Sequence, residues 1–262
     1  MFPVILIYFA LQVVFTVGVI FLFGWLIALC NKQFYANFLS HGRTVCYATG
    51  FIGTPLHELS HALMCIIFGH KIVEIKLFQI SDDGTLGYVS HTYNKRNIYQ
   101  RIGNFFIGVA PVLVISAVLY LIAYFLLSPL VTVSGLIAQS VAALNAGEIF
   151  ANLWKFIQVF FLLAATWQWW VFIAVGILFA LHMTLSNADI KGALSGLIVF
   201  LIVLFITDII LGFVSANLLV SFTRWVISAG SWLFCIMLIS LIISLIALAI
   251  SFIVRLILRK KG

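Results

Sequence analysis

Charged residues are scarce in this chain: Asp, Glu, Lys and Arg make up only 8% of its 262 residues, while 65% are hydrophobic. A soluble globular domain carries about 25% charged residues, and the mean hydropathy here is +1.24. The composition excludes a soluble enzyme that is held to a membrane by one anchor. It predicts an all-α polytopic membrane protein embedded in a lipid bilayer.

The sequence has no C-x-x-C pair, and we expect no signal peptide. The four cysteines are scattered and form no C-x-x-C pair, so they give no sign of a disulfide framework or a zinc ribbon. The net charge of +7 is explained by basic loops that orient membrane helices, so it predicts no nucleic-acid partner. Residues 2–30 lack a basic segment and form too long an apolar run for a signal peptide, so we expect a retained transmembrane helix.

Apolar runs predict about six transmembrane helices, with a small β-hairpin between the second and the third. The runs are residues 3–29, 45–68, 103–127, 169–185, 193–214 and 228–257. Scattered polar side chains in residues 128–168 indicate an amphipathic or re-entrant segment. Six spans place both termini on one side of the membrane. The basic end of the chain, which includes Lys260 and Lys261, predicts that this side is cytoplasmic.

Inside the second apolar run, a stretch of five residues contains three ionisable ones: His57, Glu58 and His61, in the pattern H-E-x-x-H. On a helix, residues four apart share one face, so both imidazoles can bind one metal ion. Ionisable groups are expensive inside a membrane and mark functional sites by default. The motif predicts a Zn²⁺ site with two histidine ligands and Glu58 as general base toward a metal-bound water. Pro55 is expected to kink or restart the helix just before it.

The polar segment after the motif has the pattern of two strands. Apolar and charged residues alternate from Val73 to Leu77, which is the period of a half-buried strand. Asp83-Gly84 is a turn signal, and the residues after it can form a return strand. We therefore predict a β-hairpin over residues 71–93, which lies in the cytoplasm in the orientation given above.

A catalytic zinc ion needs a third protein ligand from another part of the chain, together with an open position for water. The candidates are Asp189, His182, Asp208 and Glu148. Asp208 also fits an intramembrane acid paired with a polar neighbour, and Glu148 fits a solvated interfacial position. The remaining histidines, His41, His70 and His91, lie in predicted connections, where we expect them to be solvated.

Residues 54–62, Thr-Pro-Leu-His-Glu-Leu-Ser-His-Ala, resemble the signature of the site-2-protease-type intramembrane metalloproteases, peptidase family M50. That family carries H-E-x-x-H on one membrane helix and an Asp ligand, usually in an L-D-G context, at the end of a later one. Residues 185–192, Leu-Ser-Asn-Ala-Asp-Ile-Lys-Gly, are loosely similar, with an Asp and a nearby Gly. Gly108 and Pro111 are similar to a Gly/Pro motif of the third span, without its usual Asn. The resemblance covers about residues 45–192.

The resemblance implies a zinc ligand set of His57, His61 and Asp189, and a hairpin that presents substrate as a strand. The predicted topology also brings Asp189 to the same membrane face as the motif. His182 lies seven residues earlier and stays an alternative, either as the third ligand or as a residue that supports the site or relays protons.

These features predict an intramembrane zinc endopeptidase of a bacterial cell membrane, which cleaves membrane-spanning or membrane-adjacent protein or peptide substrates through a zinc-activated water. A non-catalytic zinc-binding protein of the same fold is one alternative, although it has no need of Glu58. A transporter with an intramembrane ion site is another, although it should show an internal repeat. The expected divisions are a first span and connection (1–44), a metalloprotease core (45–192) and C-terminal spans (193–262).

Overall fold

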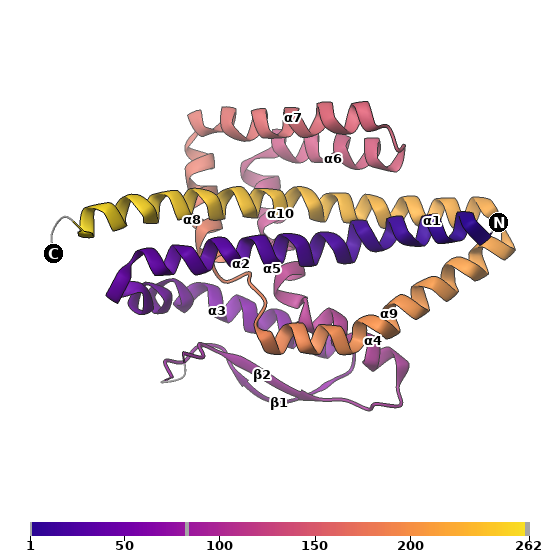
Figure 1. Cartoon of the computed structure of the whole chain (residues 1–262), viewed down its shortest axis with the longest axis horizontal. Coiled ribbons are helices and arrows are strands. Elements are labelled where there is room, and N and C mark those ends of the chain that lie inside the picture. Colours follow the sequence, from indigo (N-terminus) through magenta and orange to yellow (C-terminus); the bar gives the residue numbers. More distant parts are fainter. Residues whose placement is uncertain (1, 82–83, 260–262) are drawn as a thin grey trace. The chain divides into compact units, whose positions relative to one another are not determined.

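Helices make up most of the chain in the computed structural model, which describes residues 2–81 and 84–259 (Figure 1). In chain order the elements are α1 (Phe2–Val13), a π-helical turn η1 (Val14–Gly18), α2 (Val19–Asn37), a 3-10 turn η2 (Leu39–His41), α3 (Gly42–Ile67), β1 (Lys71–Lys76), β2 (Tyr88–Thr92), α4 (Ile98–Gly108), α5 (Ala110–Leu126), α6 (Ser128–Ala142), α7 (Ala146–Leu162), a 3-10 turn η3 (Leu163–Ala165), α8 (Trp167–Ala180), α9 (Asn187–Val214) and α10 (Ala216–Arg259).

Four of the described helices are long and apolar enough to cross a membrane: Phe2–Asn37, Ala146–Ala165, Asn187–Val214 and Ala216–Leu258. The bent pair α4 and α5 gives a fifth if it is one span. These helices agree with the predicted all-α membrane protein, but their number and positions differ from those of the six predicted spans. The predicted amphipathic segment contains one of these four helices. By contrast, α3, which carries the predicted second span, is not among them, and α8, the predicted fourth span, has only 14 residues.

The first helical stretch, which consists of α1, η1 and α2, runs further than the predicted first span. Two polar residues that were expected in a connection are buried in α2. Asn31 donates from Nδ2 to the carbonyl oxygen of Ala180 (2.8 Å), and Asn37 donates to Ser251 Oγ (2.9 Å). Both side chains are almost fully buried. Their polarity suggested a loop, but each side chain makes a hydrogen bond inside the packing of helices.

The predicted third span is broken at Val109, where α4 and α5 meet at an angle of 62°. Pro111 lies in the first turn of α5. Proline has no N–H and its ring crowds the carbonyl four residues earlier, which favours a break between α4 and α5. By contrast, α3 runs unbroken through Pro55, so the expected restart before the motif does not occur.

The predicted hairpin is present as an antiparallel pair of β1 and β2, with a bulge between Ile72 and Glu74. The connection between the strands is longer than a tight turn and spans residues 77–87. Gly84 has the positive φ (+82°) that the turn signal required, and its N–H donates to Ser81 (3.1 Å). Asp83, the other residue of that signal, lies outside the described residues, as do Lys260 and Lys261.

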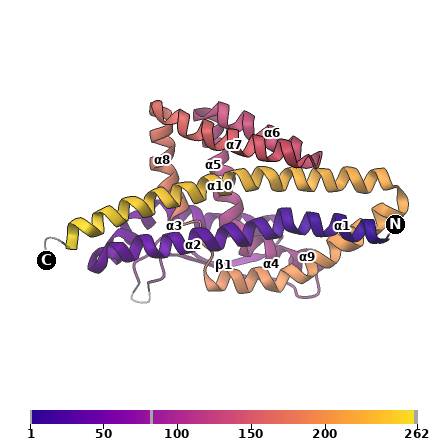
Figure 2. The same ribbon diagram turned by 45° about the horizontal axis from the view of Figure 1, so that its top comes forward.

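Two compact units make up the fold, and the first comprises Met1–Leu22, Ala117–Ile173 and Phe200–Leu238. In this unit α6 and α7 lie side by side, as both views show (Figures 1 and 2). Its fully buried Asp208 accepts a hydrogen bond from Gln12 Nε2 (2.9 Å), and the same amide donates to Thr223 Oγ1 (2.9 Å). Asp208 is therefore an acid paired with polar neighbours.

The second unit comprises Phe23–Ser116, Ala174–Val199 and Ile239–Gly262. Within it, α3 packs against both strands of the hairpin and against α4. An apolar cluster around Phe34, Leu181 and Ala247 joins α2 to the end of α8 and to α10. The H-E-x-x-H motif and the start of α9 both belong to this unit, so the candidate site can be described within it.

Candidate metal centre

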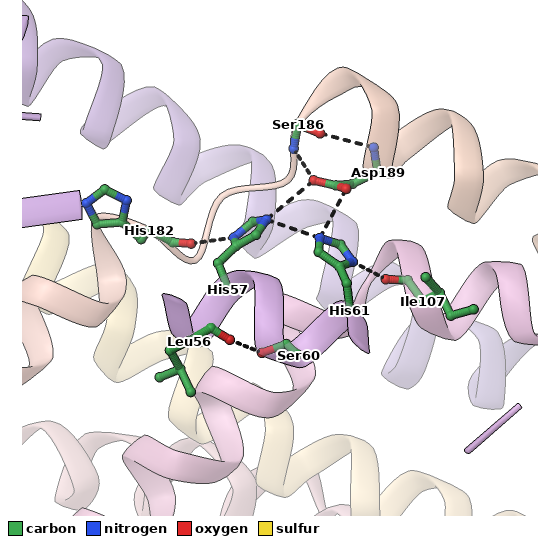
Figure 3. Close-up of polar contacts among 8 residues, drawn as sticks. All are labelled: Leu56, His57, Ser60, His61, Ile107, His182, Ser186 and Asp189. Atoms are coloured by element: carbon green, nitrogen blue, oxygen red, sulfur yellow. Dashed lines mark hydrogen bonds and ion pairs between the residues drawn. The ribbon is translucent and has the colours of Figure 1, made fainter. Parts of the chain in front are cut away.

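The two motif histidines share one face of α3, as their spacing predicted (Figure 3). Their Nε2 atoms lie 3.2 Å apart. His57 donates from Nδ1 to the carbonyl oxygen of His182 (2.8 Å), and His61 donates from Nδ1 to that of Ile107 (2.7 Å). A carbonyl only accepts, so both Nδ1 atoms carry protons and, in the neutral rings, both Nε2 atoms present lone pairs. Two lone pairs that face each other favour a shared cation.

Asp189, in the first turn of α9, lies opposite this pair (Figure 3). Its Oδ1 is 3.2 Å from Nε2 of His61, and its Oδ2 is 3.6 Å from Nε2 of His57. The carboxylate also accepts from the main-chain N–H of Ser186 (2.7 Å), while Ser186 Oγ accepts from the N–H of Asp189 (3.1 Å). This reciprocal capping box begins α9 and fixes the carboxylate at the same time.

The three side chains converge closely enough to hold one metal ion. Zinc–ligand bonds of about 2.0–2.1 Å imply ligand atoms about 3.3–3.4 Å apart along each edge of a tetrahedron, and the two histidine Nε2 atoms lie 3.2 Å apart. Asp189 approaches the two rings with different carboxylate oxygens, at 3.2 and 3.6 Å, and one ligand atom from each residue lies within 4.8 Å of the other two. Within residues 2–81 and 84–259, His57, His61 and Asp189 are the group whose ligand atoms come close enough to hold an ion. Each imidazole also has the second hydrogen bond that orients metal ligands.

The other ligand candidates lie elsewhere. Asp208 belongs to the first unit, where it is paired with Gln12, and Glu148 is exposed in the first turn of α7. The ring of His182 turns away from His57, His61 and Asp189. Its Nε2 lies 3.1 Å from Thr49 Oγ1 and 3.4 Å from Tyr35 Oη. His182 therefore contributes a carbonyl oxygen to the site, which orients His57.

Pro111 explains why a helix carbonyl is available to His61. In a continuous helix the N–H of residue 111 would donate to the oxygen of Ile107. Proline has no N–H, so this oxygen, which accepts an N–H at the C-cap of α4, keeps its second lone pair for the imidazole of His61. The break between α4 and α5 therefore supplies a hydrogen bond that orients a candidate ligand.

We expect Pro111→Ala to weaken zinc binding about 10- to 100-fold, because the restored main-chain N–H would compete for Ile107 and release His61. Competition with a zinc chelator on the purified protein measures this. Pro129→Ala is the matched control, since Pro129 begins α6 in the first unit and supports no metal ligand. Equal zinc affinity of both variants and the wild type would contradict this role of Pro111.

Two glycines allow α9 to lie directly on α4, which brings Asp189 to the histidines. A side chain at Gly108 would collide with the main-chain oxygen of Asp189, and one at Gly196 would collide with the main chain at Phe105. Small residues allow helix backbones to approach closely. The close helix contact therefore sets the position of the third candidate ligand.

Glu58 is buried at 6% exposure and makes no hydrogen bond to any other described residue, although it borders the cluster. Gly87, in the connection between the strands, lies against it, and a Cβ there would be 2.7 Å from Glu58 Cγ. Unlike the two histidines, the Glu58 carboxylate is not part of the group that could hold a metal ion. It is therefore available to a water molecule or a substrate, as the motif predicted.

A cavity of about 500 Å³ opens beside these residues. Its lining includes His57, Glu58, His61 and Asp189 together with residues of β2, of the loop before it and of α4. This volume is in the range of small-molecule and peptide sites. A second cavity of about 390 Å³ shares His57 and Glu58 and is bordered by residues 84–87.

His70 and His91 were expected to be solvated, and for His70 this is wrong. His70 is buried at 6% exposure; its Nε2 donates to the carbonyl of Gln100 (2.8 Å), and its Nδ1 lies 3.0 Å from Nδ1 of His91. The ring stacks on Tyr93, with centroids 5.1 Å apart. His91 is half-buried and lines the larger cavity. Positions 70 and 91 meet through pairing of the strands, so no local sequence signal marks this contact. His41, by contrast, is exposed.

Two helix-borne histidines, a carboxylate ligand candidate and a neighbouring Glu are the residue types of a zinc-dependent peptidase site. Residues 50–162 match a protein family described as "Putative zincin peptidase". The match contains the motif and the hairpin and ends before Asp189. It supports a zinc metallopeptidase and does not distinguish the M50 family from others. No match was found among curated proteins or among solved structures.

Proposed function

We propose that this protein is an intramembrane zinc endopeptidase of the site-2-protease type, with His57, His61 and Asp189 as zinc ligands and Glu58 as general base. The observation that carries the proposal is the convergence of ligand atoms from His57, His61 and Asp189, beside the carboxylate of Glu58, which makes no hydrogen bond to another described residue. The zincin family match and the long apolar helices support it.

When bound, zinc would polarise a peptide carbonyl and lower the pKa of a water molecule. The chain's own residues do the rest. Glu58 takes a proton from the attacking water and delivers it to the leaving amine. His182 and Ile107 hold the imidazoles in one tautomer through their carbonyl oxygens, so neither ring has to reorient during the reaction. Gly87 allows the loop before β2 to lie directly against Glu58.

The substrate of the proposed enzyme is an extended segment of a membrane protein or peptide. Residues Tyr88, Val89 and His91 of β2 line the cavity beside the candidate ligands. Because β2 pairs with β1 on one side only, its other edge can add a substrate strand through main-chain hydrogen bonds. A substrate helix has to unwind before its peptide bond reaches such a site.

The purified protein, in detergent or in liposomes, should contain about one zinc ion per chain. It should also cleave an unfolded membrane-protein segment, and a chelator should stop the cleavage until zinc is added back. Mass spectrometry of the products and metal analysis of the same sample measure both properties. A zinc-loaded protein that cleaves none of a library of membrane-protein segments would contradict the peptidase function and favour a zinc-binding protein of the same fold.

If β2 seats the substrate, Tyr88→Pro should lower cleavage about tenfold without a change in zinc content, because proline removes a main-chain donor and is tolerated at the first residue of a strand. Val73→Pro is the control. Val73 is the bulge residue of β1, has no partner in β2 and is exposed. Equal cleavage rates of the two variants would show that the hairpin is only a connection.

We keep as a proposal the predicted orientation, in which both termini and the hairpin lie on the cytoplasmic side of a bacterial cell membrane. The basic residues between positions 71 and 101, together with Lys191, support this orientation. In this proposal the metalloprotease core covers residues 45–192, preceded by one span (1–44) and followed by the C-terminal spans (193–262). Cysteine labelling from each side of the membrane, at positions 36 and 95, would test it.

A further inference from the structure

Two polar side chains of the larger cavity have no role in the mechanism given above: His91 on β2 and Asn104 on α4. Asn104 is buried at 5% exposure, yet its amide makes no hydrogen bond to any other described residue. A buried amide normally has partners. A buried amide on the cavity wall without a partner is therefore ready to bind a ligand.

The hydrogen bonds of His70 determine which nitrogen of His91 is free. The carbonyl of Gln100 requires a proton on Nε2 of His70, so Nδ1 of the neutral His70 ring is an acceptor. Nδ1 of His91, 3.0 Å away, therefore donates to it. The single ring proton of neutral His91 therefore lies on Nδ1, in the bond to His70. Nε2 of His91 is an acceptor that has no partner in the described part of the chain.

The neighbours of His91 hold it in this form. Burial lowers the pKa of His91, and the nearby histidines His70 and His61 lower it further, so the ring stays neutral near pH 7. The partner His70 is itself fixed by its stacking on Tyr93 and by the main chain of Gln100. The cavity thus presents one fixed acceptor, on His91, and the donors of one amide, on Asn104.

A peptide main chain offers the complementary groups, an N–H donor and a carbonyl acceptor in each unit. We propose that His91 and Asn104 form a subsite for the main chain of the substrate, in which His91 Nε2 accepts from a peptide N–H and Asn104 Nδ2 donates to a peptide carbonyl. This subsite rests on the proposed peptidase function and gives it a substrate class: extended peptides that are recognised through the backbone next to the scissile bond, whatever their side chains.

A double-mutant cycle between the protein and the substrate tests the His91 contact. Peptides with one N-methyl group at successive positions each lack one main-chain donor. At one position near the scissile bond, N-methylation should lower kcat/KM of the wild type about tenfold or more, and it should have little further effect in His91→Phe. At all other positions the penalty should be the same in both proteins.

His91→Phe should itself lose about tenfold in kcat/KM while it keeps its zinc, and His91→Gln, which retains an acceptor oxygen, should recover part of the loss. His41→Phe, at an exposed histidine, is the control. For Asn104, the cycle pairs Asn104→Leu with thioamide peptides, whose sulfur is a weak acceptor. N-methyl and thioamide penalties that are identical in wild type and variants at every position would overturn the subsite.

The same cycle can be measured as binding, with Glu58→Gln protein and a fluorescent peptide. This separates the two proposals. A wild-type protein that cleaves nothing, but whose peptide affinity depends jointly on His91 and one N–H, contradicts the peptidase and supports the subsite. Cleavage without any such coupling contradicts the subsite and leaves the peptidase intact.

Discussion

Glu58→Gln should keep zinc bound and lose cleavage by at least about 100-fold, and up to about 10⁴-fold, which is the usual contribution of a general base. The reason is the position of this side chain. Glu58 borders the cavity next to His57 but is not one of the three residues whose ligand atoms converge. The amide of Gln is nearly the same size, so the packing against Gly87 is preserved while the proton acceptor is lost.

Metal analysis and a cleavage assay on the same preparation measure the two halves of this expectation. Glu148→Gln is the control, because Glu148 is exposed at the start of α7 in the first unit. A Glu58→Gln protein that still cleaves at the wild-type rate would remove Glu58 from the mechanism. Loss of zinc from this variant would instead make Glu58 a ligand, contrary to the geometry.

The sequence was most informative where the chemistry depends on local spacing. The i,i+4 spacing of His57 and His61 is a property of any helix, and α3 continues through the motif despite Pro55. The alternation of residues 73–77 likewise predicted a strand that is present. The capping box of Ser186 and Asp189 was also readable as Ser-x-x-Asp, and it would have marked the start of α9 and a fixed carboxylate.

Long-range packing could not be read from the sequence. The pairing of His70 with His91 depends on strand register and on a turn of α4, and the bond from Asn31 to Ala180 joins segments about 150 residues apart. Polar residues in apolar surroundings look like loops when their partners are distant in sequence. For the same reason Pro111 was placed inside one continuous predicted span, and the break at Val109 and the bond from His61 to the Ile107 carbonyl became visible only in the folded chain.

Removal of Asp189, the proposed third ligand, should have the largest effect on metal binding. Asp189→Ala should lower zinc affinity by more than about 100-fold, beyond the effect expected for residues that only orient ligands. Two further substitutions test the other candidates for the third ligand, His182 and Asp208. His182→Ala keeps the main-chain oxygen that orients His57, so it should retain zinc. Asp208→Ala removes a buried acid of the first unit and should also retain it.

The zinc content of these three variants, measured after equilibration with a chelator of known affinity, therefore decides the ligand set. Gly108→Ala provides an independent test, because its side chain would collide with the main chain of Asp189 and move the carboxylate away from the histidines. Gly192→Ala is the control. Gly192 lies one turn after Asp189 in α9, its added side chain would meet nothing within 4 Å, and zinc binding should be unchanged. If His182→Ala loses zinc while Asp189→Ala and Gly108→Ala keep it, the third ligand is His182, and the peptidase needs a different arrangement of α9 from the one described.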